Sequence, residues 1–271
     1  MRQSEAEMCD LYDSAYIKDR LPFLGEVLIY DTVGSTNTEA KARLSQGDPG
    51  ETLIMAEEQS AGRGRLGRTW HSTRSESLIM SYIVRPDMAL ADISMITIAA
   101  ALAAAEAVRE LTGLEAMIKW PNDIFVRGHK ICGILTEAVP DPDGGPAGVV
   151  VGMGINVHNR HFPEGTGNDP SSLDLLGGRG VSRQELAAEV IRRLRDRISV
   201  LERDGDLRRM IDEYESLMTH MNREIALSSY NNPELTGSGV CRGIDRRGRL
   251  IADWQDGTER HLDSGEITVR K

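Results

Sequence analysis

The chain has 271 residues, enough for one large α/β domain and a small module, and 40% of its residues are hydrophobic while 27% are charged. Its 32 lysines and arginines against 42 aspartates and glutamates give a net charge of -10, which disfavours the diffuse basic surface of a nonspecific nucleic-acid-binding protein. No apolar run approaches the ~18 residues of a membrane span. The opening residues, MRQSEAEMCD, lack the basic and apolar regions of a signal peptide, so we expect a cytoplasmic protein.

The first third of the chain predicts strands, one helix and one unusual loop. Residues 26–33 (EVLIYDTV) predict a strand, and the capping-box spacing of TNTE (36–39) predicts the start of a helix. Residues 52–59 and 78–84 are apolar runs that predict two more strands. Between them, residues 61–75 are rich in glycine and arginine and predict a loop.

The middle of the chain predicts a buried helix followed by a series of hairpins. Residues 92–112 are rich in alanine and apolar on nearly every face, and Gly113 is placed to cap that helix in the left-handed conformation. Four short strands separated by turn signals follow, with the sequences AMIKW, DIFV, KICGILTEAV and GVVVGMGINV.

The last third predicts two helices and then a small β domain. A second capping box, SRQE (182–185), opens an amphipathic stripe that runs to Gly205, and a further apolar stripe covers residues 207–218. After about residue 222 the chain changes to short alternating runs with turns, which is typical of a small all-β barrel. The chain thus divides into an N-terminal extension (1–25), a large domain (26–221) and a C-terminal domain (222–271).

The loop at 61–75 is the strongest local signal for a binding site. Four arginines, at positions 63, 65, 68 and 74, occur with no acidic residue between Gln59 and Ser75. Glycines allow backbone N–H groups to approach an anion, and guanidinium groups bind carboxylate or phosphate through paired hydrogen bonds, so the loop predicts an anionic ligand. The alternative is a solvated basic loop.

The same loop contains G-x-G-x-x-G at glycines 62, 64 and 67, but we reject a dinucleotide-binding fingerprint. That fingerprint needs an apolar helix directly after the loop, whereas RTWHSTRSES (68–77) is polar and leads into a strand. A Walker A motif is also absent from the sequence.

Two further segments carry residues suited to a ligand. In KWPND (119–123), the Asn-Asp pair sits at a strand edge, where the carboxylate of Asp123 could meet a metal-bound phosphate, and Lys130 opens the next strand. A solvated strand-end lysine is the alternative for Lys130. In GMGIN (152–156), two glycines before an amide suit close approach to a flat ligand, with a β-bulge as the alternative.

Taken together, five motifs in this order resemble those of the biotin protein ligase family, the biotin–[acetyl-CoA-carboxylase] ligases. They are GSTNTEAK (34–41), AEEQSAGRGRLGRTWHS (56–72), KWPNDIFV (119–126), KICGILTE (130–137) and GMGINV (152–157). GIDRRGRL (243–250) and SGEI (264–267) also resemble the C-terminal domain of that family. The resemblance implies an α+β fold similar to class II synthetases: a mixed β-sheet with helices packed on one face, followed by an SH3-like β-barrel.

The resemblance also implies roles for individual residues. It assigns biotin binding to Ser35, Thr36, Asn37, Gln59, Arg63, Gly64, Arg65, Lys130 and Gly133. It assigns ATP binding to Arg65, Arg68, Trp70, Asn122 and Asn156, the metal site to Asp123, and catalytic roles to Lys130, Arg63 and Arg65. The hydroxyls and amide of the first motif suit the ureido head of biotin, and the arginines would neutralise carboxylate and phosphate charge. The sequence departs from the family at Leu66, which is often arginine, and at His71, where an aromatic residue is expected.

The implied function is an ATP-dependent ligase that uses biotin, ATP and Mg²⁺. It would form biotinyl-5′-AMP and transfer biotin to a lysine of the biotin carboxyl carrier protein of acetyl-CoA carboxylase or another biotin-dependent carboxylase. Only about 25 residues precede the first strand, so we expect a monofunctional ligase without the DNA-binding domain of bifunctional members, and neither DNA nor a membrane as a partner. A monomer and a homodimer both remain open. Alternatives are a lipoate or octanoate ligase of the same fold, and a noncatalytic adenylate-binding module.

Overall fold

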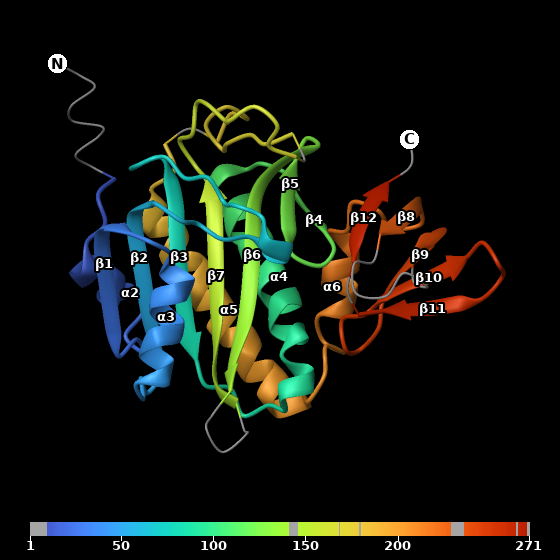
Figure 1. The fold of residues 1–271 in the computed structure, drawn as a ribbon, viewed down its shortest axis with the longest axis horizontal. Coiled ribbons are helices and arrows are strands. Elements are labelled where there is room, and N and C mark those ends of the chain that lie inside the picture. The colour runs from blue at the N-terminus through green and yellow to red at the C-terminus, as the bar shows by residue number, and fades with distance from the viewer. Residues whose placement is uncertain are drawn as a thin grey trace.

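The computed structural model describes residues 10–140, 146–167, 169–178, 180–228, 236–263 and 265–269. Its centre is a mixed seven-stranded sheet with the strand order β1-β2-β3-β7-β6-β5-β4 (Figure 1). The strands are β1 (Glu26–Val33), β2 (Thr52–Gln59), β3 (Ser77–Val84), β4 (Ala116–Lys119), β5 (Asp123–Val126), β6 (His129–Pro140) and β7 (Pro146–Asn156). β1 and β2 pair in parallel and the other neighbours are antiparallel. The predicted strands of this domain are therefore confirmed.

Helices cover both faces of this sheet, so the expectation of helices on one face was wrong. Helices α4 (Ser94–Thr112) and α5 (Arg183–Asp204) lie together behind the sheet in Figure 1, and α3 (Thr36–Ser45) lies in front. Ala40 and Leu44 of α3 pack in a second, smaller core with Ile54, Ile83, Val139 and Val150. The reason lies in β2 and β3. Every residue of β3 and the first six residues of β2 are buried, so these strands must be covered on both faces.

The ends of the helices follow the sequence signals in most places. Gly113 caps the end of α4 in the left-handed conformation predicted for it, with a φ of 70°. α5 begins after Ser182, whose hydroxyl accepts a hydrogen bond from Glu185 N at 3.4 Å. The helix expected over 207–218 is reduced to α6 (Ile211–Ser216). Leu207 N donates to Arg246 O at 2.9 Å, which ties the start of that stripe to the C-terminal domain, and Ile211 N donates to Leu207 O at 3.2 Å in a turn that leads into α6.

The capping box predicted at the start of α3 is also wrong. Ser35, not Thr36, is the N-cap residue, and it makes no side-chain hydrogen bond to the helix. The Thr36 hydroxyl bonds to Gln59 Oε1 at 3.1 Å and to Ser81 Oγ at 2.8 Å. Its hydroxyl is therefore used to join the helix to β2 and β3.

Residues 10–25, assigned above to an extension, pack into the main core. The short helix α2 (Ser14–Arg20) buries Ile17, and Leu21 is likewise fully buried. Asp10 accepts hydrogen bonds from the backbone N and the Nε of Arg183, a buried residue at the start of α5.

The C-terminal part forms a second, five-stranded antiparallel sheet, which confirms the predicted small β domain (Figure 1). Its strands are β8 (Glu224–Ser228), β9 (Gly237–Ile244), β10 (Leu250–Trp254), β11 (Glu259–Leu262) and β12 (Glu266–Val269), in the order β11-β10-β9-β8-β12. The two domains are joined by Trp120 Nε1, which donates to Gly248 O at 2.8 Å, and by Ile244 N, which donates to Glu215 Oε1 at 2.9 Å. Within the described ranges, no helix combines the length and apolarity needed to cross a bilayer.

Candidate active site

A pocket of about 740 Å³ opens on the face of the sheet that carries α3. Side chains alternate along a strand, so Gly133 of β6 and Gly152 and Gly154 of β7 lie on the same face as Val150 of the α3 core. The segment between β2 and β3 crosses in front of β7 and β6 (Figure 1). Every site residue assigned from the sequence lines this pocket: Ser35, Thr36, Asn37, Gln59, Arg63, Gly64, Arg65, Arg68, Trp70, Asn122, Asp123, Lys130, Gly133 and Asn156.

The glycines of the pocket floor make room for the indole ring of Trp70. Gly133 and Gly154 are paired across β6 and β7, and a Cβ on Gly154 would lie 2.3 Å from Trp70 Cε2. A Cβ on Gly133 would lie 3.0 Å from Trp70 Cζ3. The close approach at GMGIN is made here by the Trp70 ring, and the flat ligand stays a prediction. The β-bulge alternative is wrong, because β7 pairs in regular register with β3 from Val149 to Asn156.

The glycine- and arginine-rich loop folds back on itself over this floor. Trp70 N donates to Gly62 O at 3.0 Å, and a Cβ on Gly62 would lie only 2.3 Å from Trp70 O, so this close approach requires glycine. Gly64 N donates to Arg68 O at 2.8 Å around a single 3₁₀ turn, η1 (Arg65–Gly67). The loop therefore presents its arginines from a tight hairpin.

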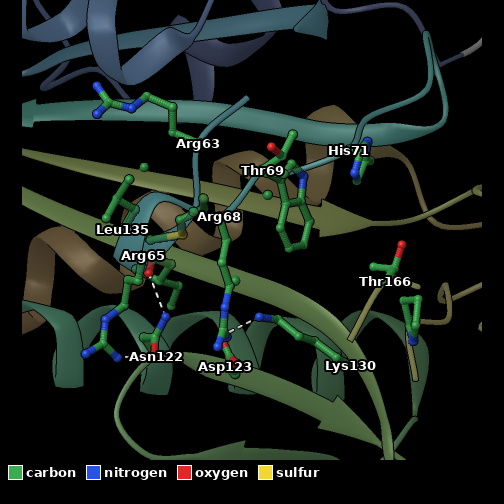
Figure 2. Close-up of a pocket in the computed structure, with 18 of the residues that line it drawn as sticks. Arg63, Arg65, Arg68, Thr69, His71, Asn122, Asp123, Lys130, Leu135 and Thr166 are labelled. Carbon is green, nitrogen blue, oxygen red and sulfur yellow. Dashed lines mark hydrogen bonds and ion pairs between the residues drawn. The ribbon is translucent and has the colours of Figure 1, made fainter. Parts of the chain in front are cut away.

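The four arginines of the loop do not all enter one site. Arg65 Nη1 donates to Asn122 Oδ1 at 2.7 Å. Figure 2 shows Arg65 and Arg68 extending toward Asn122 and Asp123, whereas Arg63 extends away from them. Arg74 lies outside the pocket lining and pairs with Asp31, with Nη1 and Oδ2 at 3.0 Å. Of the four arginines, Arg63, Arg65 and Arg68 therefore line the pocket and Arg74 does not.

Lys130 is held in place from three sides. Its Nζ lies 2.7 Å from Asp123 Oδ1 and 5.8 Å from the centroid of the Trp70 ring (Figure 2). Its backbone N and O bond to Asp169 O at 3.2 Å and to Ser171 N at 3.0 Å. Because only 18% of its side chain is exposed, the alternative of a solvated strand-end lysine does not hold.

The two asparagines assigned to ATP use their amides to hold the backbone around the pocket. Asn122 Nδ2 donates to Ile134 O at 2.9 Å, and Asn156 Nδ2 donates to Ser171 O at 3.0 Å. Both side chains are buried. In this arrangement Asn122 positions Arg65, and Asn156 positions the segment that pairs with Lys130.

Cys132 lies next to these groups in sequence but is unsuited to act as a nucleophile. Burial raises the pKa of its thiol, and the nearby charge of Lys130 only partly offsets this effect. The thiol therefore stays protonated at neutral pH. The described residues around the pocket instead offer cationic groups and hydrogen-bond donors, which suit the binding and positioning of an anionic substrate.

Comparisons with known proteins give the family of this chain. Residues 29–156 match the Biotin/lipoate A/B protein ligase family, and residues 220–270 match the Biotin protein ligase C terminal domain. The chain is 35% identical over 229 residues to the Biotin--[acetyl-CoA-carboxylase] ligase of Mycobacterium tuberculosis, covering 81% of this chain and 80% of that protein. It is 32% identical over 246 residues to the Bifunctional ligase/repressor BirA of Escherichia coli, covering 91% of this chain and 74% of that protein. The chain belongs to the biotin protein ligase family.

A solved structure supports the fold of this ligase along nearly its whole length. The biotin protein ligase from Aquifex aeolicus in complex with biotin and ATP has a TM-score of 0.77 and 26% sequence identity, covering 92% of this chain and 100% of that chain. The mixed sheet and the small C-terminal sheet are thus the arrangement of a known biotin ligase.

Sequence analysis of the ligase missed several parts of the pocket wall. The segment 162–167 lines the pocket, as do Gly265 and Ile267 of the C-terminal domain. Segment 162–167 lacks a charge pattern or motif, and its proline and glycines indicate only a turn. The contribution of Gly265 and Ile267 depends on how the two domains pack, which local sequence does not encode.

Proposed function

We propose that this ligase joins biotin to a carrier-protein lysine in two half-reactions within the pocket described above. In the first, the carboxylate oxygen of biotin attacks the α-phosphate of Mg·ATP, which forms biotinyl-5′-AMP and releases pyrophosphate. In the second, the ε-amine of the acceptor lysine attacks the carbonyl carbon of that mixed anhydride. An amide forms, AMP leaves, and the amine gives up a proton.

The observation that carries this proposal is the opposite character of the two ends of the pocket. Ser35, Thr36 and Gln59 bring neutral hydrogen-bonding groups to its β2 side, and Lys130 brings a cationic side chain to its β6 side, with β3 and β7 between them. Biotin has a neutral, hydrogen-bonding ureido head and an anionic carboxylate tail. Its two ends therefore match the two ends of the pocket.

The cationic end addresses the main obstacle of the first half-reaction, which is repulsion between a carboxylate and a phosphate. The ammonium of Lys130 reduces this repulsion where the two anions meet, and Arg65 and Arg68 neutralise phosphate charge. Trp70 offers an aromatic face for the adenine. This chemistry is positioning and charge neutralisation, and it needs no nucleophile from the protein.

For magnesium, the pocket offers the carboxylates of Asp123 and Glu164. Among the described residues, no group of three or more His, Cys, Asp and Glu side chains is placed to hold a metal ion. Asp123 is paired with Lys130 at 2.7 Å. Mg²⁺ in such enzymes is commonly bound by one or two carboxylates together with substrate phosphates, so we propose that it enters as Mg·ATP and that Asp123 is its protein ligand.

The C-terminal domain, proposed above as residues 222–271, would serve the second half-reaction. Gly265 and Ile267 bring it to the wall of the same pocket. A carrier domain that presents its lysine there would approach the adenylate from the side of this wall. We propose the biotin carboxyl carrier protein of acetyl-CoA carboxylase, or of another biotin-dependent carboxylase, as the acceptor, and the cytoplasm as the location.

The test is biotin transfer to a purified carrier domain. With biotin and Mg·ATP, the wild-type chain should release pyrophosphate and attach biotin to one lysine of the carrier, as measured by mass spectrometry. A carrier with that lysine replaced by arginine should gain no biotin. Binding of biotin and ATP without pyrophosphate release would make the chain a noncatalytic adenylate-binding module instead.

A further inference from the structure

A series of hydrogen-bonded polar side chains, buried at Thr36, Asn37 and Ser81 and half-buried at Lys41 and Glu137, starts at the pocket wall. Lys41 Nζ lies 2.6 Å from Glu137 Oε1, and Asn37 Nδ2 donates to Glu137 Oε2 at 2.9 Å. Ser81 Oγ lies 2.6 Å from Asn37 Oδ1 and 2.8 Å from Thr36 Oγ1. We call these five residues the polar chain. It connects a carboxylate at the edge of α3 to a hydroxyl that lines the pocket.

The polar chain has a defined place in the fold. Ser81 is fully buried, and Asn37 and Thr36 are 5% and 3% exposed. A Cβ on Gly152 would lie 1.9 Å from Asn37 Oδ1, so the glycine leaves a notch in the sheet that the amide fills. Side chains with so little freedom keep the orientation that their hydrogen bonds dictate.

Glu137 sets the direction of these hydrogen bonds because an ionised carboxylate can only accept them. Burial alone would raise the pKa of Glu137, but hydrogen bonds from Lys41 and Asn37 outweigh it and keep the pKa below its usual value. The charge of Arg63 acts in the same direction. Glu137 is therefore ionised at neutral pH.

The direction passes along the polar chain to Thr36. Asn37 must turn its Nδ2 to Glu137, and a second contact from Nδ2 to Leu135 O at 3.2 Å supports this orientation. Its Oδ1 then accepts the single hydroxyl proton of Ser81. Because Ser81 has one hydroxyl proton and its shorter contact, 2.6 Å, is with Asn37 Oδ1, the Thr36 hydroxyl must be the donor in the 2.8 Å contact with Ser81 Oγ. Gln59 Oε1 then accepts from Thr36 N at 2.8 Å. The Thr36 oxygen is left with lone pairs to offer a ligand.

We propose that Glu137 is a positioning residue that determines specificity: through Asn37 and Ser81 it fixes Thr36 as a hydrogen-bond acceptor for an N–H group of the substrate head. This inference rests on the proposed function, in which the neutral end of the pocket binds that head. A cyclic urea carries such N–H groups, whereas octanoate and the dithiolane ring of lipoate do not. Asn37 then acts through Ser81 and is not itself a ligand contact.

The first test is Glu137→Gln, measured by ATP–pyrophosphate exchange. A glutamine can donate as well as accept, so only the contact of Nδ2 with Leu135 O still favours the present orientation of Asn37, and the role of Thr36 is less firmly fixed. The KM for biotin should rise roughly tenfold, as expected for loss of about one hydrogen bond, while the KM for ATP and kcat at saturating biotin change less than about twofold. Glu39→Gln is the matched control, since Glu39 lies on α3, as Asn37 does, and accepts from Tyr30 Oη at 3.2 Å, outside the polar chain.

The second test distinguishes a relay from a general loss of packing. Ser81→Ala removes one oxygen and should raise the KM for biotin several-fold. In that background Glu137→Gln should have no further effect, because the connection to Thr36 is already cut. Thermal unfolding of each variant shows whether it is folded. Equal effects of Glu137→Gln in both backgrounds, or a biotin KM unchanged by it, would overturn the inference while leaving the proposed function intact. Wild-type protein without biotin-dependent exchange would overturn the proposed function itself.

Discussion

Lys130 is the residue whose role depends most on its neighbours. Its ammonium is paired with Asp123 at 2.7 Å and lies in the pocket, where the carboxylate and the α-phosphate would meet. A fixed charge at that point contributes more when two anions are forced together than in either ground state, so its loss should appear mainly in the rate.

Lys130→Met should therefore slow adenylate formation by about 10²–10³-fold while biotin affinity falls less. Lys130→Arg should rescue poorly, because the wider guanidinium cannot reproduce a compact charge beside Asp123. Single-turnover assays of adenylate formation, with transfer from pre-formed biotinyl-5′-AMP as the comparison, measure this directly. Adenylate formation by Lys130→Met at the wild-type rate would remove Lys130 from the mechanism.

The indole ring of Trp70 packs against Gly133 and Gly154 on the pocket floor. We therefore expect this ring to stack on the adenine of ATP and not to serve as part of the core. Trp70→Ala should weaken ATP binding by about 1–3 kcal/mol, the usual contribution of base stacking, and affect biotin much less. Trp70→Phe keeps an aromatic face and should retain most of the affinity. Calorimetric titration with each ligand checks this. A large drop in Tm with equal loss of both affinities would instead identify Trp70 as part of the core.

At the scale of elements, His158 ties the end of β7 to residues distant in sequence. Its Nε2 lies 3.1 Å from Asp10 Oδ2 and its Nδ1 lies 3.0 Å from Asp174 Oδ2. The hydrogen bond to Asp10 raises the pKa of His158, burial opposes this, and Asp174 adds to the rise. A protonated His158 therefore stabilises the folded state.

This raised pKa gives the stability a defined pH dependence. The contribution of His158 should be complete below its ordinary pKa of 6.5 and should be lost as the pH rises through the higher pKa of the folded state. Urea unfolding of wild type and His158→Gln between about pH 6 and 9 should show a difference in free energy that shrinks as pH rises. A difference that stays constant over this range would contradict the account.

Sequence patterns predicted the helices and strands better than the contacts between them. Apolar runs gave the strands, and Gly113 and Ser182 marked helix ends, because these signals are local. The position of α3 and the partners of His158 were not predictable, since they depend on packing between segments far apart in the chain. Site residues were recognised from motifs, but the motifs do not show that the amide of Asn37, although it lines the pocket, is turned to Glu137.

At the scale of the whole molecule, the pocket is complete only when both domains are in place. Trp120 Nε1 donates to Gly248 O at 2.8 Å, and Ile267 lines the pocket from the C-terminal side. Trp120→Phe removes that donor and leaves a carbonyl without its partner, at a cost of about 1–3 kcal/mol. We expect faster hydrogen exchange in β10 and β11 and a larger loss in biotin transfer than in adenylate formation. Exchange as slow as in wild type would show that this bond does not hold the domains together.

The most direct test of the account is ATP–pyrophosphate exchange with biotin, lipoate and octanoate side by side. Thr36 and Gln59 offer hydrogen-bond acceptors at one side of the pocket, and Lys130 offers a cation at the other. We therefore predict rapid exchange with biotin and little exchange with the other two acids. Exchange that is equal for all three, or faster with octanoate or lipoate, would contradict the assignment of biotin as the substrate.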